Sequence, residues 1–166
     1  MKKNLKISVI ICCYNSEKNI IRTLEHLARQ DFSGDWEVIL VDNNCTDGTV
    51  ALSKSAWSEL STDVTLKIVQ EKRPGLSFAR EQGIANSNSP LLVFCDDDNW
   101  LAPDYLTVAV TYMNQNPSVG IAGGFNEAVI ECAMPRHEKF SWEWYAVGQQ
   151  GEKTGDITTS KGYVFG

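Results

Sequence analysis

Four short apolar segments lie in the first hundred residues, and polar residues follow each of them. They read KISVIICCYN (6–15), WEVILVDNN (36–44), VTLKIVQ (64–70) and PLLVFC (90–95). Runs of this length that are rich in β-branched residues favour strands buried on both faces rather than helices. The third segment alternates apolar and polar positions, which predicts a strand nearer the edge of a sheet.

The segments between these strands have helical spacing instead. Apolar residues recur three and four positions apart between Ile20 and Ala28, which predicts an amphipathic helix. Three further helices are predicted, over residues 45–57, 73–87 and about 103–114. Ser16 is the expected N-cap of the first helix, and Thr46 or Asp47 is the expected N-cap of the second.

The alternation of strands and helices over short connections predicts an α/β fold, with a Rossmann-like, mostly parallel sheet and helices on both faces. SVGIAGG (118–124) is predicted as a fifth strand. A chain of 166 residues fits one domain. We expect a single domain, with its core in residues 7–125 and with loops, a short helix and late strands in residues 126–166.

Composition narrows the classes of protein that fit. The chain is 43% hydrophobic and 22% charged and carries a formal charge of −6, with its Lys and Arg scattered, so a nucleic-acid partner is not expected. No apolar run approaches the roughly 20 residues that span a bilayer. We therefore expect a cytoplasmic protein without a transmembrane segment in this chain, and any membrane association would be peripheral, through further residues of the full protein.

The five cysteines give no sign of a disulfide framework or a zinc site. Their number is odd, two are adjacent, and no CxxC spacing occurs. We interpret them as small apolar residues of a protein in a reducing compartment.

Polar residues at three strand ends form the strongest candidate site, because ligands of an open parallel sheet bind outside the carboxyl ends of its strands. These residues are Tyr14 and Asn15, Asp42 and Asn43, and the triplet Asp96–Asp98 in LLVFCDDDNW. In an extended segment, the first and third carboxylates project to one side and the second projects away. Mg²⁺ or Mn²⁺ with phosphate oxygens would suit them. The alternative is a solvated turn that caps the following helix.

Three further candidates each have two interpretations. Asp42 could accept hydrogen bonds from a base or ribose, or could serve only the turn that follows it. Arg80 could bind an anionic ligand or could be an ordinary surface arginine. The aromatic residues Trp142, Trp144 and Tyr145 could stack on a sugar ring, although core packing is the favoured interpretation.

Taken together, SVIICCYN, VILVDNNCTDGT, RPGLSFAREQGI and LLVFCDDDNWLAPDYL resemble the family 2 glycosyltransferases, over residues 7 to about 125 and in the same order. The resemblance implies the GT-A fold and a nucleotide-diphosphate-sugar donor, usually a UDP-sugar. It also implies a metal-dependent transfer with inversion to a polysaccharide or glycolipid acceptor, through a direct displacement.

The resemblance also assigns roles to individual residues. Asp42 would hydrogen-bond the uracil, Tyr14 would be available to stack on it, and Asp98 together with Asp96 would hold Mn²⁺ or Mg²⁺ on the diphosphate. The full set of donor-binding residues would be Cys12, Cys13, Tyr14, Asp42, Arg80, Asp96 and Asp97.

The sequence departs from the family pattern in two places near the donor site and in one place later. Cys12 stands where Pro or Thr is frequent, and Asn43 stands where a second Asp is frequent. The family's catalytic base is a later Asp or Glu in a Glu-Asp segment, and no such segment precedes YVFG at 163–166. The acidic residues Glu131, Glu138, Glu143 and Asp156 match no such motif.

The expectation is therefore a donor-binding N-terminal portion of a longer enzyme, with its base beyond Gly166. Two rival functions stay open. One is a sugar-phosphate nucleotidyltransferase, which would normally carry a glycine-rich basic loop after the first strand, and CCYNSEKN has none. The other is a noncatalytic nucleotide-binding module, which the missing base would suit.

Overall fold

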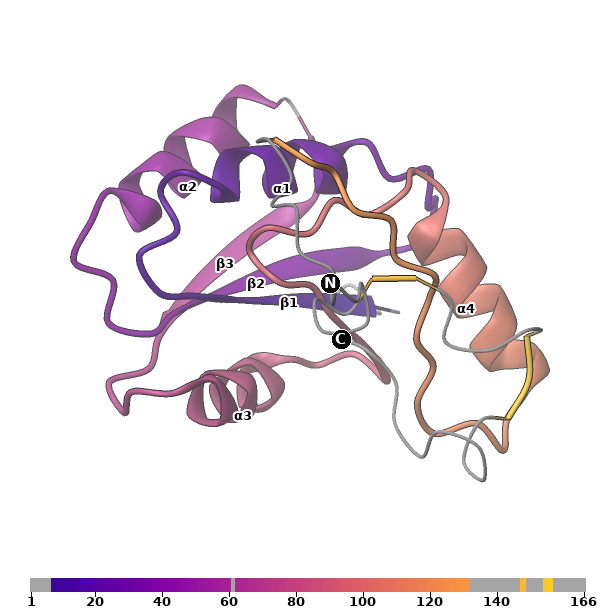
Figure 1. The fold of residues 1–166 in the computed structure, drawn as a ribbon. Helices are drawn as coiled ribbons and strands as arrows, with labels where there is room; N and C mark the ends of the chain where they lie inside the picture. Colours follow the sequence, from indigo (N-terminus) through magenta and orange to yellow (C-terminus); the bar gives the residue numbers. More distant parts are fainter. Residues whose placement is uncertain (1–6, 61, 132–146, 149–153, 157–166) are drawn as a thin grey trace, which may run out of the picture. The chain divides into compact units, whose positions relative to one another are not determined.

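The computed structural model describes residues 7–60, 62–131, 147–148 and 154–156 (Figure 1). Strands and helices alternate along the chain, as the sequence predicts. The elements are β1 (Ile7–Cys13), α1 (Ile20–Ala28), β2 (Trp36–Asp42), α2 (Thr49–Glu59), β3 (Thr65–Gln70), α3 (Leu76–Asn86), β4 (Leu91–Phe94) and α4 (Tyr105–Gln115).

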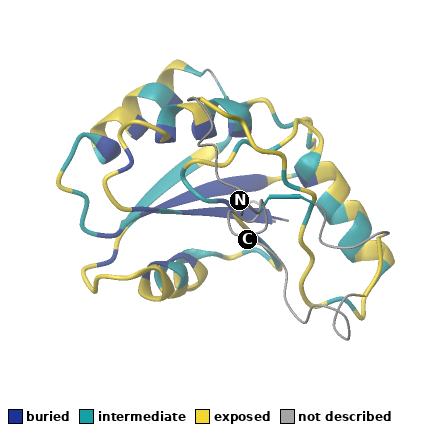
Figure 2. Ribbon diagram, in the orientation of Figure 1, coloured by how far each residue is buried: buried dark blue, intermediate teal, exposed yellow. Residues whose placement is uncertain are grey.

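The four strands form one sheet in the order β3-β2-β1-β4, and every neighbouring pair is parallel. The register pairs Cys13 with Asp42 and Asp42 with Gln70, so the carboxyl ends of three strands lie level at one edge. The apolar β1 and β2 are central and almost entirely buried, whereas the mixed β3 is partly exposed (Figure 2). The predicted edge position of the third strand is confirmed.

Helices cover both faces of the sheet, which confirms the predicted architecture (Figure 1). Alternate residues of a strand point to opposite faces. Ile7, Val9 and Ile11 accordingly pack in one core cluster with residues of α1 and α2. Ile10 and Ile39 pack in a second cluster with residues of α3.

Helix α3 approaches the sheet closely because its buried positions carry small residues. Ala79 and Gly83 are the buried residues of this helix. A methyl group built on Gly83 would lie 2.4 Å from Cγ2 of Ile10 in β1, well inside van der Waals contact. The absence of a side chain at this position therefore determines how near α3 lies to the sheet, and α3 carries Arg80.

Three local predictions are wrong. The N-cap of α2 is Gly48, without a side-chain capping bond, rather than Thr46 or Asp47. Residues 118–124 do not form a strand, and Ile121 is 77% exposed there. Three glycines in seven residues weaken a strand, because they gain no packing and lose much backbone entropy. Ser16 does not cap α1, which begins at Ile20 after Asn19, because the Ser16 hydroxyl donates to Asp97 instead.

The backbone divides into two compact units, Met1–Asn114 and Gln115–Gly166. The sheet belongs to the first unit. In the described part of the second unit, Asn126 and Gly148 form an antiparallel bridge, and an open depression there is lined by Phe125, Ile130 and Val147 among others. Most of the short helix and late strands expected in 126–166, and the residues Trp142, Trp144 and Tyr145, lie outside the described residues.

No helix among the described residues is long and apolar enough to cross a membrane.

Candidate functional site

The residues that directly follow the four strands meet at the carboxyl edge of the sheet, and we call this edge the rim. The rim comprises residues 14–16, 42–45, 71–75 and 95–99, together with the first turns of α3. Asp42 closes β2 and is included because its side chain belongs to the turn that follows. The rim is therefore the place where the polar strand ends of the sequence come together, as predicted from the parallel topology.

The middle carboxylate of the acidic triplet is directed toward α1. Asp97 accepts a hydrogen bond at Oδ2 from the hydroxyl of Ser16, and its backbone carbonyl accepts one from Oγ1 of Thr23 at 2.8 Å. Burial raises the pKa of Asp97 above its usual range. The side chain of Asp98, in contrast, is exposed. Asp97 therefore fastens the triplet to α1.

The acidic segment is held to α1 over a longer stretch as well. The amide of Gln30 donates to the carbonyl of Ala102 at 2.7 Å and accepts from the backbone N–H of Leu106 at 3.1 Å. The ring of Trp100 stacks on His26, with ring centroids 5.5 Å apart, and lies under the guanidinium of Arg22. Helix α1 and Gln30, which follows it, therefore support the triplet and the start of α4.

Arg80 and Asp96 approach each other across the rim. Nη2 of Arg80 lies 4.0 Å from Oδ1 of Asp96, and its guanidinium lies 5.4 Å from the ring centroid of Phe94. Both charged side chains are partly exposed, at 33% and 45%. An ion pair with this separation and this solvent exposure contributes little to stability, well under about 1 kcal/mol. Both groups therefore stay accessible to a ligand with charged or hydroxyl groups.

The two cysteines at the end of β1, beside the rim, are poor nucleophiles. Burial raises the pKa of Cys12, beside Arg80, to about 11, so the thiol is neutral near pH 7. Cys13 is buried, and burial raises the pKa of its thiol further. Its carbonyl accepts hydrogen bonds from Asn43 N–H at 2.9 Å and Cys45 Sγ at 3.4 Å. Cys12 and Cys13 thus end β1 beside the rim and do not serve as reactive groups.

Asp42 closes β2, and Tyr14 directly follows Cys13, the residue of β1 that pairs with Asp42. Oδ1 of Asp42 accepts a hydrogen bond from the backbone N–H of Cys45 at 2.8 Å, which is the turn role considered from the sequence. This bond occupies one of the two carboxylate oxygens. The side chain of Tyr14 is 68% exposed at the rim. Asp42 therefore combines a turn role with a carboxylate at the rim, and the two interpretations are compatible.

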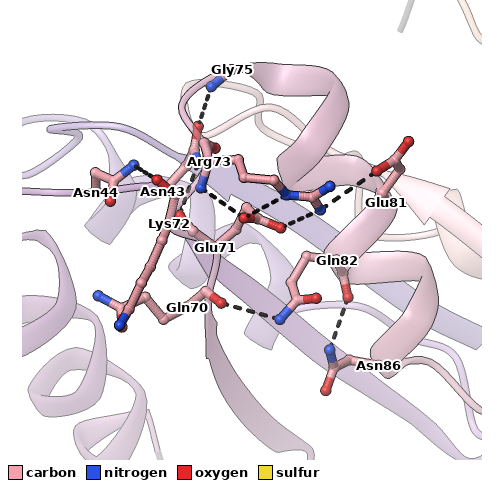
Figure 3. A network of polar contacts seen from close by, with 10 residues as sticks. All are labelled: Asn43, Asn44, Gln70, Glu71, Lys72, Arg73, Gly75, Glu81, Gln82 and Asn86. Atoms are coloured by element: carbon pink, nitrogen blue, oxygen red, sulfur yellow. Dashed lines mark hydrogen bonds and ion pairs between the residues drawn. The ribbon is translucent and has the colours of Figure 1, made fainter.

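The side chain of Asn43 makes three hydrogen bonds within the rim (Figure 3). It is only 6% exposed. Its Nδ2 donates to the carbonyls of Glu71 at 3.0 Å and Arg73 at 2.7 Å, and its Oδ1 accepts from the N–H of Gly75 at 2.8 Å. Sequence reasoning treated Asn43 as a turn residue and missed this role, because its partners are backbone groups about thirty residues away.

Arg73 is engaged by the same loop. Its Nε and Nη2 donate to the two carboxylate oxygens of Glu71 at 3.1 and 2.7 Å (Figure 3). Its guanidinium also lies over the ring of Phe78. The hydrogen bonds from Arg73 lower the pKa of Glu71 to about 2. A second ion pair, at 3.5 Å, joins Arg73 to Glu81.

The fit of a divalent cation can be judged from the triplet. Among the described residues, no three acidic, histidine or cysteine side chains converge on one point. Mg²⁺ and Mn²⁺ nevertheless take one or two carboxylates and complete their shell with water and phosphate oxygens. Asp98 and Asp96, both accessible, meet that smaller requirement.

Comparison with known proteins identifies the family. The chain matches the model of "Glycosyl transferase family 2" over residues 8–160. Staphylococcus aureus TarS, a poly(ribitol-phosphate) beta-N-acetylglucosaminyltransferase, is 30% identical over 69% of this chain and 20% of its own length. YfnE of Bacillus subtilis, an uncharacterized glycosyltransferase, is 27% identical over 81% of this chain and 34% of its own length.

Solved structures agree with the sequence comparison. S. aureus TarS in complex with UDP-GlcNAc superposes with a TM-score of 0.68 at 26% identity, over 80% of this chain and 37% of that one. Mannosyltransferase PcManGT from Pyrobaculum calidifontis, in complex with GDP-Man and Mn²⁺, gives a TM-score of 0.60 at 30% identity. The match covers 68% of this chain and 33% of that one. The chain spans well under half the length of each of these proteins. The predicted GT-A fold is confirmed by these neighbours.

With its parallel sheet, its acidic rim and a family match over residues 8–160, the chain belongs to glycosyl transferase family 2.

Proposed function

We propose that this chain provides the donor site of a glycosyltransferase that uses a nucleotide-diphosphate-sugar, with a UDP-sugar as the donor. One observation carries the proposal: the rim brings Tyr14, Asp42, Arg80 and the acidic triplet to one edge of the sheet, with Arg80 4.0 Å from Asp96. The TarS structures with UDP and with UDP-GlcNAc support the choice of nucleotide.

The chemistry of each group suggests its role. A carboxylate oxygen of Asp42 can accept the ring N–H of uracil, and the exposed ring of Tyr14 can stack on the base. Arg80 can donate to a phosphate oxygen, and Asp96 can accept from a ribose hydroxyl. Asp97 contributes indirectly, by holding the segment that carries Asp96 and Asp98.

The metal would be held by Asp98, with Asp96 beside it. Hard divalent cations prefer such oxygen ligands, and a family neighbour is described with Mn²⁺. When bound, Mn²⁺ or Mg²⁺ would supply charge neutralisation for the diphosphate that leaves the sugar. The chain's own contribution is to hold two accessible carboxylates on a support fixed by α1.

The finer points of the reaction belong to the same proposal. Transfer would invert the anomeric carbon by direct displacement, and the acceptor would be a polysaccharide or glycolipid hydroxyl. TarS acts on poly(ribitol-phosphate), as its name states, and its similarity supports a polymeric acceptor. The displacement needs a carboxylate within hydrogen-bond reach of the acceptor hydroxyl. We assign that base to none of the residues that the structure describes.

The proposal also covers organisation and location. We keep the hypothesis of one GT-A domain with its core in residues 7–125 and the beginning of the acceptor side in 126–166. A cytoplasmic site of action, with peripheral membrane contact through other parts of the full protein, stays a prediction.

Calorimetric titration with UDP, in Mn²⁺ and in EDTA, tests the proposal. Saturable binding that Mn²⁺ strengthens and that GDP, CDP and ADP displace poorly is the expected result. Release of pyrophosphate from a nucleoside triphosphate and a sugar phosphate would instead indicate a nucleotidyltransferase. Absence of binding to every nucleotide would refute the assignment of the rim as a donor site.

A further inference from the structure

We propose that Asn43 is a positioning residue that holds the loop of residues 71–75 beside Asp42, and that this loop sets which nucleobase the site accepts. The inference rests on the proposed function, because it concerns the selectivity of the same donor site. It goes beyond that function by naming a residue that acts without touching the nucleotide.

The side chain of Asn43 uses both of its polar atoms on the loop. Its amide nitrogen donates to the carbonyls of Glu71 and Arg73, at 3.0 and 2.7 Å, and its oxygen accepts from Gly75 at 2.8 Å (Figure 3). A buried amide with three bonds to one segment has little freedom to move. Removal of the amide would leave one buried backbone carbonyl and two partly buried backbone groups without these partners, which is costly.

The backbone extends the connection to the neighbouring strands. The N–H of Asn43 donates to the carbonyl of Cys13 at the end of β1, and the N–H of Glu71 donates to the carbonyl of Asp42, each at 2.9 Å. Asn43 therefore joins the loop to the two strand ends from which Tyr14 and Asp42 project. A shift of the loop would change the shape of the rim beside both residues.

The loop has features of a fixed wall rather than of a flexible connection. Gly75 has a φ of 126°, a backbone conformation that residues with a side chain rarely adopt, and its N–H is held by Asn43. The guanidinium of Arg73 is tied to the carboxylate of Glu71 and lies over Phe78. A preorganised wall discriminates between bases better than one that adapts, because misfitting ligands cannot displace it.

Asparagine makes two contacts here that the aspartate frequent at this position in the family would not make with the same loop carbonyls. Aspartate has nearly the same shape but offers no donor, so the carbonyls of Glu71 and Arg73 would face a carboxylate oxygen. Asn43→Asp is therefore an isosteric change that reverses two of the three contacts. Asn43→Ala removes all three, and comparison of the two variants separates the loss of shape from the loss of donors.

Gln82→Ala is the matched control. Gln82 also donates its amide to a backbone carbonyl near the end of β3, that of Gln70 at 3.1 Å, but the bond is exposed and does not involve the loop (Figure 3). When this exposed hydrogen bond is lost, water replaces it, so the free energy of unfolding should change little. Alanine is also a good helix residue at this position.

Two measurements on the full chain test the inference. Amide hydrogen exchange reports whether the Gly75 N–H stays protected, independently of any ligand. Dissociation constants for UDP, CDP and GDP report nucleobase selectivity. We expect Asn43→Ala to speed Gly75 exchange about tenfold, and both Asn43 variants to weaken UDP binding about tenfold while the preference for UDP over CDP and GDP falls. Gln82→Ala should match the wild type in both measurements.

Unchanged selectivity in folded Asn43 variants would overturn the inference, whatever happens to stability. Equal weakening for all three nucleotides would also overturn it, because that pattern indicates a merely structural role. If the wild-type chain bound no nucleotide, the proposed function and the selectivity claim would both fail, and the exchange rates would still show whether Asn43 holds the loop. Asn43→Asp keeps the measurement possible if Asn43→Ala does not fold.

Discussion

The close approach of α3 to the sheet predicts the effect of a substitution at Gly83 on stability, from its contact with Ile10. In Gly83→Ala the new methyl group would lie 2.4 Å from Cγ2 of Ile10, and 3.3 and 3.4 Å from two further carbons of the same side chain. Ile10 is 1% exposed and β-branched, so it has little room to rotate. Overpacking of this kind costs about 1–3 kcal/mol.

Helix propensity acts in the opposite direction at the same position. Replacing a helical glycine with alanine gains about 1 kcal/mol. The net effect should be a loss of about 1 kcal/mol in the free energy of unfolding, or about 2–4 °C in Tm for a chain of this size. Because α3 also carries Arg80, a displaced helix should weaken nucleotide binding as well.

Urea denaturation and thermal melting of a double-mutant cycle separate the two effects. In an Ile10→Ala background the clash is gone, so Gly83→Ala should then stabilise by about 1 kcal/mol, which gives a coupling of about 2 kcal/mol. Gln82→Ala, at a half-buried position of α3 whose side-chain hydrogen bond is exposed, is the control and should change little. If Gly83→Ala stabilises the wild-type background by as much as the Ile10→Ala background, the described packing of α3 is incorrect.

Three further predictions follow from the rim and the core. Asp98→Ala should abolish the gain in UDP affinity that Mn²⁺ gives, without lowering Tm. The control Asp63→Ala, at the other end of the sheet, should keep that gain. Calorimetry measures both affinities, and an unchanged effect of Mn²⁺ in Asp98→Ala would rule out Asp98 as the metal ligand. Arg73 lowers the pKa of Glu71 to about 2, from an ordinary value of 4.5. The contribution of the ionised Glu71 to the free energy of unfolding is therefore complete above pH 4.5 and is lost as the pH falls toward 2. The difference in unfolding free energy between wild type and Glu71→Gln should shrink over that interval, and a constant difference would contradict the pairing. Burial raises the pKa of Cys95 to about 12, so its thiol should react with a disulfide reagent at pH 8 only at the rate of unfolding; rapid native-state labelling would show that the thiol is accessible.

The regular part of the fold could be predicted because its signals are local. The apolar runs of β1 and β2 and the helical spacing from Ile20 to Ala28 each determine one element within a few residues. The prediction of a strand at 118–124 failed because isolated apolar residues among glycines carry too little packing information. Ser16 has the chemistry of an N-cap, but a tertiary partner, Asp97, was available to its hydroxyl.

The candidate site could be predicted only in outline. A parallel sheet places the carboxyl ends of its strands at one edge, so the sequence predicts that Tyr14, Asp42 and the acidic triplet are neighbours. The alternation within the triplet predicted that Asp97 would point away from the other two carboxylates, and the structure directs it to Ser16. Sequence offered no sign of the contacts of Asn43, because backbone carbonyls from another loop leave no residue-specific trace.

Amide chemical-shift changes, recorded while the ¹⁵N-labelled chain is titrated with UDP and the diamagnetic Mg²⁺, show directly where the nucleotide binds. The changes should concentrate at residues 12–16, 42–45, 71–80 and 94–99, which form or adjoin the rim. Changes confined to other residues, such as the depression lined by Phe125 and Ile130, or no saturable changes at all, would contradict the assignment of the rim as the donor site.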